Sequence, residues 1–142
     1  MGVVLNEEKL ALIARFEHLT GAGSRDVIAD EENNRFIFIV NNGEMGLAIG
    51  KQGANIKKAA ETLGKRCEVV EYSDDPSQFL KNCFHPAKVT EIQYSDYHGD
   101  QIAHVVIMDE DRGLAIGKAG KNLNRTKMLA LREHNIQNII LE

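Results

Sequence analysis

The sequence predicts an α+β protein made of two tandem modules, each with the order helix-strand-strand-helix-helix-strand and a three-stranded sheet packed by helices. The phrase GLAIGKQGANI returns almost unchanged as GLAIGKAGKNL, and the hydrophobic patterns on both sides of it return as well. Its matching glycines, Gly50 and Gly117, are 67 residues apart, and twice this spacing nearly fills the 142 residues. We therefore expect one module in residues 1–73 and a second in residues 74–142.

The first half contains each of the six elements in order. The apolar spacing in NEEKLALIARFEHLTGAG predicts a helix that begins after a candidate N-cap, Asn6. RDVIADEENNRFIFIV holds two strand-like pieces around the turn ENNR, and Phe36 and Phe38 are expected in the core. A helix then begins at Gly46, breaks at GKQG and resumes until Gly64, and KRCEVVEY is a short strand.

The second half repeats this order. DPSQFLKNCF predicts a short helix with Pro76 near its start and Pro86 beyond its end. Two strands, AKVTEIQYS and QIAHVVIM, are joined by a loop that contains HGD. A helix broken at GKAG, a longer helix to about Glu133 and the strand QNIILE follow. The junction between the halves is short and partly apolar, unlike a Gly/Ser linker, so we expect the modules to dock.

The composition is that of a globular protein, with 43% hydrophobic and 27% charged residues. No apolar run reaches the roughly 18 residues of a membrane span, and the first residues lack a secretory pattern, so we expect a cytoplasmic protein without membrane contact. Cys67 and Cys83 are expected to be free thiols. The five histidines are scattered without the spacing of a metal site, so we expect no metal and no cofactor.

Positive charge is concentrated around the two copies of the phrase, although the formal net charge is −4. Residues 46–66 contain five basic residues and one acidic residue, and residues 112–132 contain six basic residues and no acidic one. This pattern is typical of an anion-binding surface. The alternative is a pair of ordinary solvated helix faces, which charge alone would favour.

The repeated loop does not have the sequence of a nucleotide-phosphate loop. A P-loop needs G-x-x-x-x-G-K-[ST], whereas both copies are one residue short and Lys51 and Lys118 are followed by Gln52 and Ala119, which cannot hold magnesium. No catalytic set of side chains has a recognisable spacing, so we expect neither an enzyme nor a small-molecule substrate. For a single GxxG, a tight helix corner without a ligand would be the more frequent explanation.

Two copies with the same flanking residues favour a binding loop over a helix corner without a ligand. Both read I-G-K-x-G-x-N followed by an aliphatic residue, from Ile49 to Ile56 and from Ile116 to Leu123. This resembles the signature I-G-x-x-G-x-x-I of KH domains, whose GxxG loop clamps a backbone of about four nucleotides. The element order resembles the type II KH arrangement, and the tandem modules with FLKNCFHPAKV at the junction are similar to archaeal NusA-like transcription factors.

The resemblance implies single-stranded RNA binding in transcription termination or elongation, with RNA polymerase as a further candidate partner. A KH-fold module that binds proteins, or one associated with ribosomes or ribonucleoproteins without a direct role in transcription, is the alternative. A loop that had lost RNA binding would have lost its lysine or gained an acidic residue at its middle positions, and neither copy has. Whether both modules bind RNA stays open, and the more basic surroundings favour the second.

The expected chemistry follows from the helix that begins after each loop. Its free N–H groups and dipole favour an anion, glycines let a phosphate backbone approach, and a lysine adds charge. Asn55 and Asn122 either donate to RNA or cap this helix. Without aromatic residues at the loops, aliphatic contacts and base-edge hydrogen bonds would hold the bases, although the four flanking aliphatic residues are expected to be mainly core. The expected RNA-binding residues are Ile49, Gly50, Lys51, Gln52, Gly53, Asn55, Lys57, Lys58, Ile116, Gly117, Lys118, Ala119, Gly120, Lys121, Asn122 and Arg125.

Overall fold

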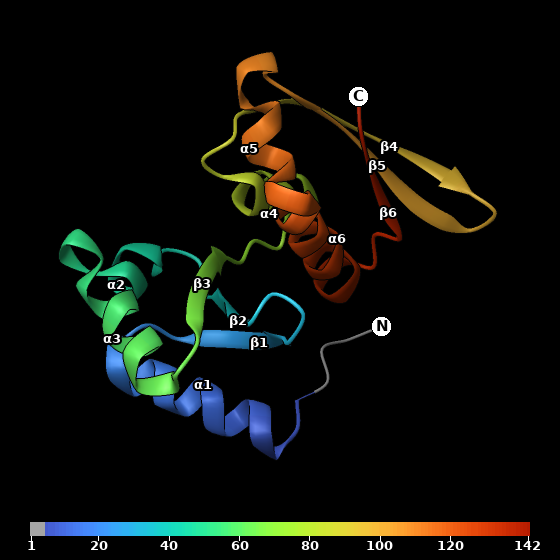
Figure 1. Cartoon of the computed structure of the whole chain (residues 1–142). Coiled ribbons are helices and arrows are strands. Elements are labelled where there is room, and N and C mark those ends of the chain that lie inside the picture. Colours follow the sequence, from blue (N-terminus) through green and yellow to red (C-terminus); the bar gives the residue numbers. More distant parts are fainter. Residues whose placement is uncertain (1–4) are drawn as a thin grey trace. The chain divides into compact units, whose positions relative to one another are not determined.

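The computed structural model describes residues 5–142 as two compact units, one ending at Ser73 and one beginning at Asp74 (Figure 1). Each unit contains one three-stranded sheet and its own hydrophobic core. Both sheets have the same connectivity, with an antiparallel pair followed by a parallel one. The predicted α+β architecture of two modules, each with a three-stranded sheet packed by helices, is therefore confirmed.

In the first unit, β2 is the central strand and pairs antiparallel with β1 and parallel with β3. The two short helical segments α2 and η1 and the longer α3 lie between β2 and β3 in the chain. The elements are α1 (Glu7–Thr20), β1 (Ser24–Asp30), β2 (Arg35–Val40), α2 (Met45–Ile49), η1 (Lys51–Gly53), α3 (Ala54–Leu63) and β3 (Arg66–Glu71).

In the second unit, β5 is the central strand and pairs antiparallel with β4 and parallel with β6. The elements are α4 (Pro76–Phe84), β4 (Val89–Tyr97), β5 (Asp100–Ile107), η2 (Asp109–Asp111), α5 (Arg112–Ile116), η3 (Lys118–Gly120), α6 (Lys121–His134) and β6 (Asn138–Leu141). Apart from the one-turn η2, which the sequence analysis did not predict, the order repeats that of the first unit.

One face of the first sheet is covered by all three α-helices of its unit. Phe36, Phe38 and Val40 alternate along β2 and therefore point to the same face, where they meet residues of α1, α2 and α3. Phe16 of α1 stacks on Phe38 with ring centroids 4.0 Å apart. Burial of each such side chain stabilises the unit by about 1.5–3 kcal/mol. The expectation that Phe36 and Phe38 are core residues is confirmed.

The second sheet is packed in the same way. Ala103, Val105 and Ile107 alternate along β5 and meet Leu80 and Phe84 of α4, together with residues of α5, α6 and β6. Since each core is built from its own elements, each unit holds its loop between two helices that are anchored on its own sheet.

Side-chain caps fix where two of the helices start. The side-chain oxygen Oδ1 of Asn6 accepts a hydrogen bond from the Lys9 backbone N–H at 2.9 Å, as its predicted N-cap role requires. Asp75 caps α4 by accepting from the Ser77 backbone N–H at 3.2 Å. The strand pair β4–β5 extends further than predicted, because His98 and Gly99 (φ 53° and 89°) form a two-residue turn in place of a longer loop.

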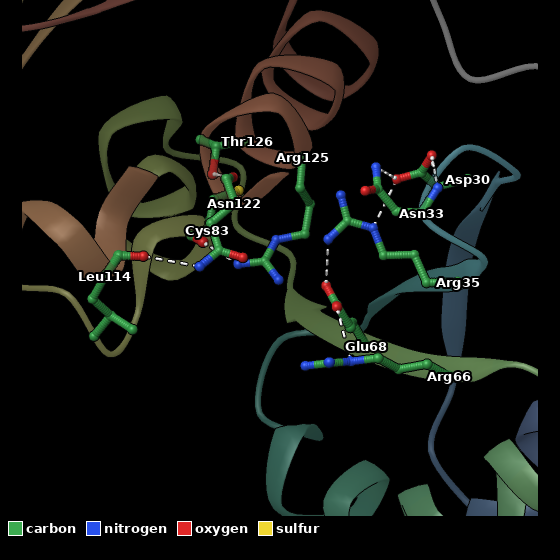
Figure 2. Close-up of polar contacts among 10 residues, drawn as sticks. All are labelled: Asp30, Asn33, Arg35, Arg66, Glu68, Cys83, Leu114, Asn122, Arg125 and Thr126. Atoms are coloured by element: carbon green, nitrogen blue, oxygen red, sulfur yellow. Dashed lines mark hydrogen bonds and ion pairs between the residues drawn. The ribbon is translucent and has the colours of Figure 1, made fainter. Parts of the chain in front are cut away.

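A buried ionic cluster joins the three strands of the first sheet (Figure 2). Arg35 Nε donates to Asp30 Oδ2 at 2.7 Å, and Arg35 Nη1 donates to Glu68 Oε1 at 3.1 Å. Burial alone would raise the pKa of Asp30, but hydrogen bonds from Asn33 and Arg35 and the charge of Arg35 outweigh it and lower that pKa. Asp30 therefore stays ionised, and the cluster fixes β1, β2 and β3 relative to one another.

Both cysteines are free thiols, as expected, and both are buried. Burial raises the pKa of Cys67 to about 11 and raises that of Cys83 still further, so both thiols stay protonated and unreactive at neutral pH. Among residues 5–142, no helix combines the length and the apolar composition that crossing a membrane requires.

Candidate nucleic-acid interface

The two repeated loops have the same backbone conformation. In the first, Gly50 has φ 76° and ψ 173°, Gln52 has φ 54° and ψ 29°, and Gly53 has φ 76° and ψ 15°. The second loop repeats these values in the same order, at Gly117 (77°, 172°), Ala119 (55°, 25°) and Gly120 (76°, 11°). Three of the four residues of each loop thus have positive φ, and one of the three is not a glycine.

Each loop ends at the N-terminus of a longer helix. Gly53 and Gly120 occupy the N-cap positions of α3 and α6, and neither helix has a side-chain cap there. The Ala54 and Lys121 N–H groups donate to the Lys51 and Lys118 carbonyls within the loops. The helix dipole adds partial positive charge at this end. The geometry therefore offers each loop as a place for an anion, as the sequence analysis expected.

The two glycines of each loop are needed for different reasons. A Cβ on Gly50 would lie 2.7 Å from Asn55 Cγ, and a Cβ on Gly117 would lie 2.7 Å from Asn122 Cγ. Their φ and ψ also fall in a region that is essentially restricted to glycine. Around Gly53, by contrast, the nearest atom to such a Cβ is Lys57 Cε at 3.7 Å. The first glycine is thus required by the loop itself, whereas a Cβ at the second glycine would stand at ordinary contact distance from its neighbours.

The asparagine after each loop bonds back to the helix before it, as Figure 2 shows for Asn122. Asn55 Nδ2 donates to the Leu47 carbonyl at 2.8 Å, and Asn122 Nδ2 donates to the Leu114 carbonyl at 2.9 Å. Neither side chain caps its own helix, so the structure does not bear out that alternative. The expected contact of both residues with RNA stays a prediction.

The remaining site residues divide by exposure. The exposed side chains are Lys51, Gln52, Lys57, Lys58, Lys118 and Ala119. The flanking aliphatic residues Ile49, Ile56, Ile116 and Leu123 are half-buried, as are Lys121, Asn122 and Arg125. Ile56 and Leu123 pack against the cores of their units, in line with their expected core role.

Arg125 is half-buried and bonds to the end of another helix. Its Nη2 donates to the Cys83 carbonyl at the end of α4, at 3.3 Å (Figure 2). This contact gives Arg125 a structural role in joining α6 to α4. Its expected role in RNA binding stays a prediction.

Sequence reasoning missed three residues beside the loops. Leu47 and Leu114, at matching positions, remain 49% and 47% exposed although they are large and apolar. Asn124 matches Lys57 in the repeat, and its Nδ2 would lie 3.8 Å from a Cβ on Gly120. The signal was available, since aligning the two copies places these residues at the same distance from their loops.

One polar network lies away from the loops, on strands of the second sheet. Ser95 Oγ lies 2.8 Å from His104 Nε2, and His104 Nδ1 lies 2.7 Å from Glu142 Oε1. Sequence reasoning missed this chain of contacts because its members come from β4, β5 and the residue after β6. The network links the three strands through exposed or half-buried side chains.

Comparison with known protein families matches both halves of the chain to KH domains. Residues 13–92 match the family model of the KH domain, and residues 76–141 match that of the NusA-like second KH domain. With a glycine loop joining two helices on a three-stranded mixed sheet, each unit is of the KH class. The KH-domain match covers more than half of the chain.

Relatives that match nearly the whole of this chain identify the family within the KH class. The "Probable transcription termination protein NusA" of Methanococcus vannielii is 36% identical over 98% of this chain and 79% of its own length. The protein of the same name from Halococcus morrhuae is 35% identical over 99% of both chains. The crystal structure of APE1850 is 38% identical, with a TM-score of 0.89 over 97% of this chain and 100% of that one. The chain belongs to the NusA-like family of KH-domain proteins.

Proposed function

We propose that the protein binds single-stranded RNA through its two GKxG loops, without catalysis, as a factor in transcription termination or elongation. The observation that carries this proposal is the loop itself, which occurs twice with the same backbone angles, the same lysine and the same helix N-terminus without a side-chain cap. One such corner has a purely structural explanation. A second copy with an exposed lysine at the same position favours a shared ligand.

The proposed binding mode places one phosphate against each loop. The positive end of the α3 or α6 helix dipole faces the phosphate oxygens, and Lys51 or Lys118 adds a positive charge. Because Gly53 and Gly120 carry no Cβ, the RNA backbone can approach closely. Arginine or lysine side chains further along the helix would follow the strand.

The proposed base contacts are aliphatic. Leu47 and Leu114 expose about half of their surface next to the loops, and the half-buried Ile49 and Ile116 are close in sequence. Such surfaces hold a base less tightly than an aromatic platform, which is worth about 1–3 kcal/mol per base. Two sites on one chain would offset this through avidity.

The proposed role in transcription comes from the relatives, whose name assigns them to transcription termination. By this proposal the modules in residues 1–73 and 74–142 hold nascent RNA, and RNA polymerase is the candidate protein partner. The alternative is a module of a ribosome or another ribonucleoprotein, which would use the same loops on a different RNA.

The salt dependence of binding tests the phosphate contacts. Each phosphate contact on a single strand contributes about −0.7 to the slope of log affinity against log salt, so one four-nucleotide site gives roughly −3 and two sites roughly twice that. The measurement is fluorescence anisotropy with a labelled single-stranded RNA over a series of KCl concentrations. Duplex RNA of the same sequence is the control, and equal binding of the duplex or a flat slope would contradict the proposal.

The Ser95–His104–Glu142 network provides a test of the proposal that the protein is not an enzyme. We expect Ser95 to remain unmodified by a fluorophosphonate probe, because the network is open to water and a nucleophile needs preorganised donors in a water-excluded site. Mass spectrometry of the intact protein measures the modification, with Ser95→Ala as the control. A probe adduct that disappears in Ser95→Ala would show an activated serine and contradict this part of the proposal.

A further inference from the structure

We propose that Asn55 and Asn122 are positioning residues, each of which holds its GKxG loop in the RNA-binding shape before RNA arrives. The proposal rests on the proposed RNA-binding function of the loops. It gives the two asparagines a role that differs from a direct contact with RNA and from a helix cap. Three independent features of the loops support it.

The first feature is the hydrogen bond across the corner. α2 and α5 have only five residues each, and the last carbonyls of a helix have no intrahelical donor. Asn55 Nδ2 supplies a donor to the Leu47 carbonyl at 2.8 Å, and Asn122 Nδ2 supplies one to the Leu114 carbonyl at 2.9 Å. Each asparagine belongs to the helix after the loop, so its bond ties that helix to the one before the loop.

The second feature is the close fit between asparagine and glycine. A Cβ on Gly50 would meet Asn55 Cγ, Nδ2 and Cβ at 2.7, 2.8 and 2.9 Å, and the corresponding distances from Gly117 to Asn122 are 2.7, 2.8 and 3.0 Å. The asparagine side chain therefore fills the space that any other residue at the glycine position would need. The two residues form a matched pair in both copies.

The third feature is backbone strain in the middle of the loop. Gln52 and Ala119 have φ of 54° and 55°, a conformation that residues with a Cβ adopt at a cost. Such a residue persists only when its surroundings hold it there. The hydrogen bond of the asparagine spans this strained residue in both loops, so it is placed to keep the loop from relaxing.

A loop of fixed shape matters for binding, because ordering a loop on contact lowers affinity. If the asparagine holds the N–H groups and the lysine in place, RNA meets a site that is already formed. Removal of the asparagine bond should then weaken binding through a looser loop, with the other residues of the site unchanged.

The test is Asn122→Asp in the full chain, since aspartate keeps the shape but replaces the donor with an oxygen that faces the Leu114 carbonyl. We expect faster amide hydrogen exchange at Ala119 and Gly120 without RNA, measured by NMR, and about tenfold weaker binding of a labelled single-stranded RNA. Asn124→Asp is the control, because it adds the same charge at an exposed position two residues along α6. In this control, exchange in the loop should be no faster than in the wild type.

Each outcome decides the proposal. Faster exchange with a loss of affinity beyond that of the control supports it. A loss of affinity with unchanged exchange would show that Asn122 contacts RNA directly, and faster exchange with unchanged affinity would show that the loop shape is unimportant; both overturn it. If the wild type fails to bind RNA, the proposed function is wrong, and the exchange rates still decide whether Asn122 holds the loop.

A second measurement covers the case in which Asn122→Asp does not fold. Asn122→Ala adds no charge and opens the space beside Gly117. In a double-mutant cycle, Gly117→Ala should therefore destabilise the protein less in the Asn122→Ala background than in the wild type. If the destabilisations caused by the two substitutions simply add, Gly117 and Asn122 are not coupled, and the proposal that they form a matched pair is wrong.

Discussion

Replacement of Lys51, Gln52, Lys118 and Ala119 together by aspartate is expected to weaken single-stranded RNA binding by about 100-fold or more. Each loop would lose its lysine and place two negative charges where a phosphate is proposed to lie, and like charges brought together cost several kcal/mol. Fluorescence anisotropy with a labelled single-stranded RNA measures the loss. A folded variant with unchanged affinity would rule out the loops as the binding site.

The fold should survive these four substitutions. All four side chains are exposed. Gln52 and Ala119 have positive φ, which aspartate accepts more readily than most residues do. Circular dichroism checks this expectation.

A control with the same total charge isolates the effect of position. Lys9→Asp, Lys81→Asp and Lys88→Asp together change the formal charge by six units, as the four loop substitutions do. This control should keep most of the affinity, because its changes lie outside the loops. The two loops can also be changed one at a time, and the loss in each variant then measures how much each module contributes.

Gly117→Ala is expected to lower the free energy of unfolding by about 3 kcal/mol, since it combines a glycine-only backbone conformation with overlap against Asn122. Gly50→Ala should behave alike, because its Cβ would come equally close to Asn55. Gly120→Ala combines a left-handed backbone with a Cβ at an ordinary contact distance, 3.8 Å from Asn124 Nδ2, so about 1 kcal/mol is expected. Urea unfolding followed by circular dichroism gives these values.

The repeated phrase also contains a matched control for this series. Gly113 lies inside α5 without a positive φ, and no atom lies within 4 Å of the position that a Cβ would take there. Gly113→Ala should therefore stabilise the protein by about 0.5–1 kcal/mol, as expected for a helix interior. If the alanine at position 113 and the one at position 117 had the same effect, the special geometry assigned to Gly117 would be wrong.

Local pattern was enough to predict the element order and the place of both loops. Helix and strand periodicity, the turn residues and the repeat all act over a few neighbouring residues, and they agreed in both halves. The core role of Phe36 and Phe38 followed from alternation along a single strand. The loop glycines were also identified, although the reason for the first glycine was incomplete.

What the sequence did not reveal depends on atoms brought together by the fold. The contact of Asn122 with the Leu114 carbonyl requires a corner of known shape, and the bond from Arg125 to Cys83 requires the packing of α6 on α4. The contacts of Ser95, His104 and Glu142 depend on the register of three strands. None of these distances follows from spacing along the chain.

The separate cores of the two units have a consequence for how the protein can change over time. The core on the helix side of each sheet is built from residues of its own unit, so a substitution in that core acts on the helices that hold the loop of the same unit. The two loops already differ at Gln52 and Ala119 while sharing one backbone shape. By the proposed function, the middle residue of each loop can therefore change the RNA preference of its own unit while the loop keeps its shape.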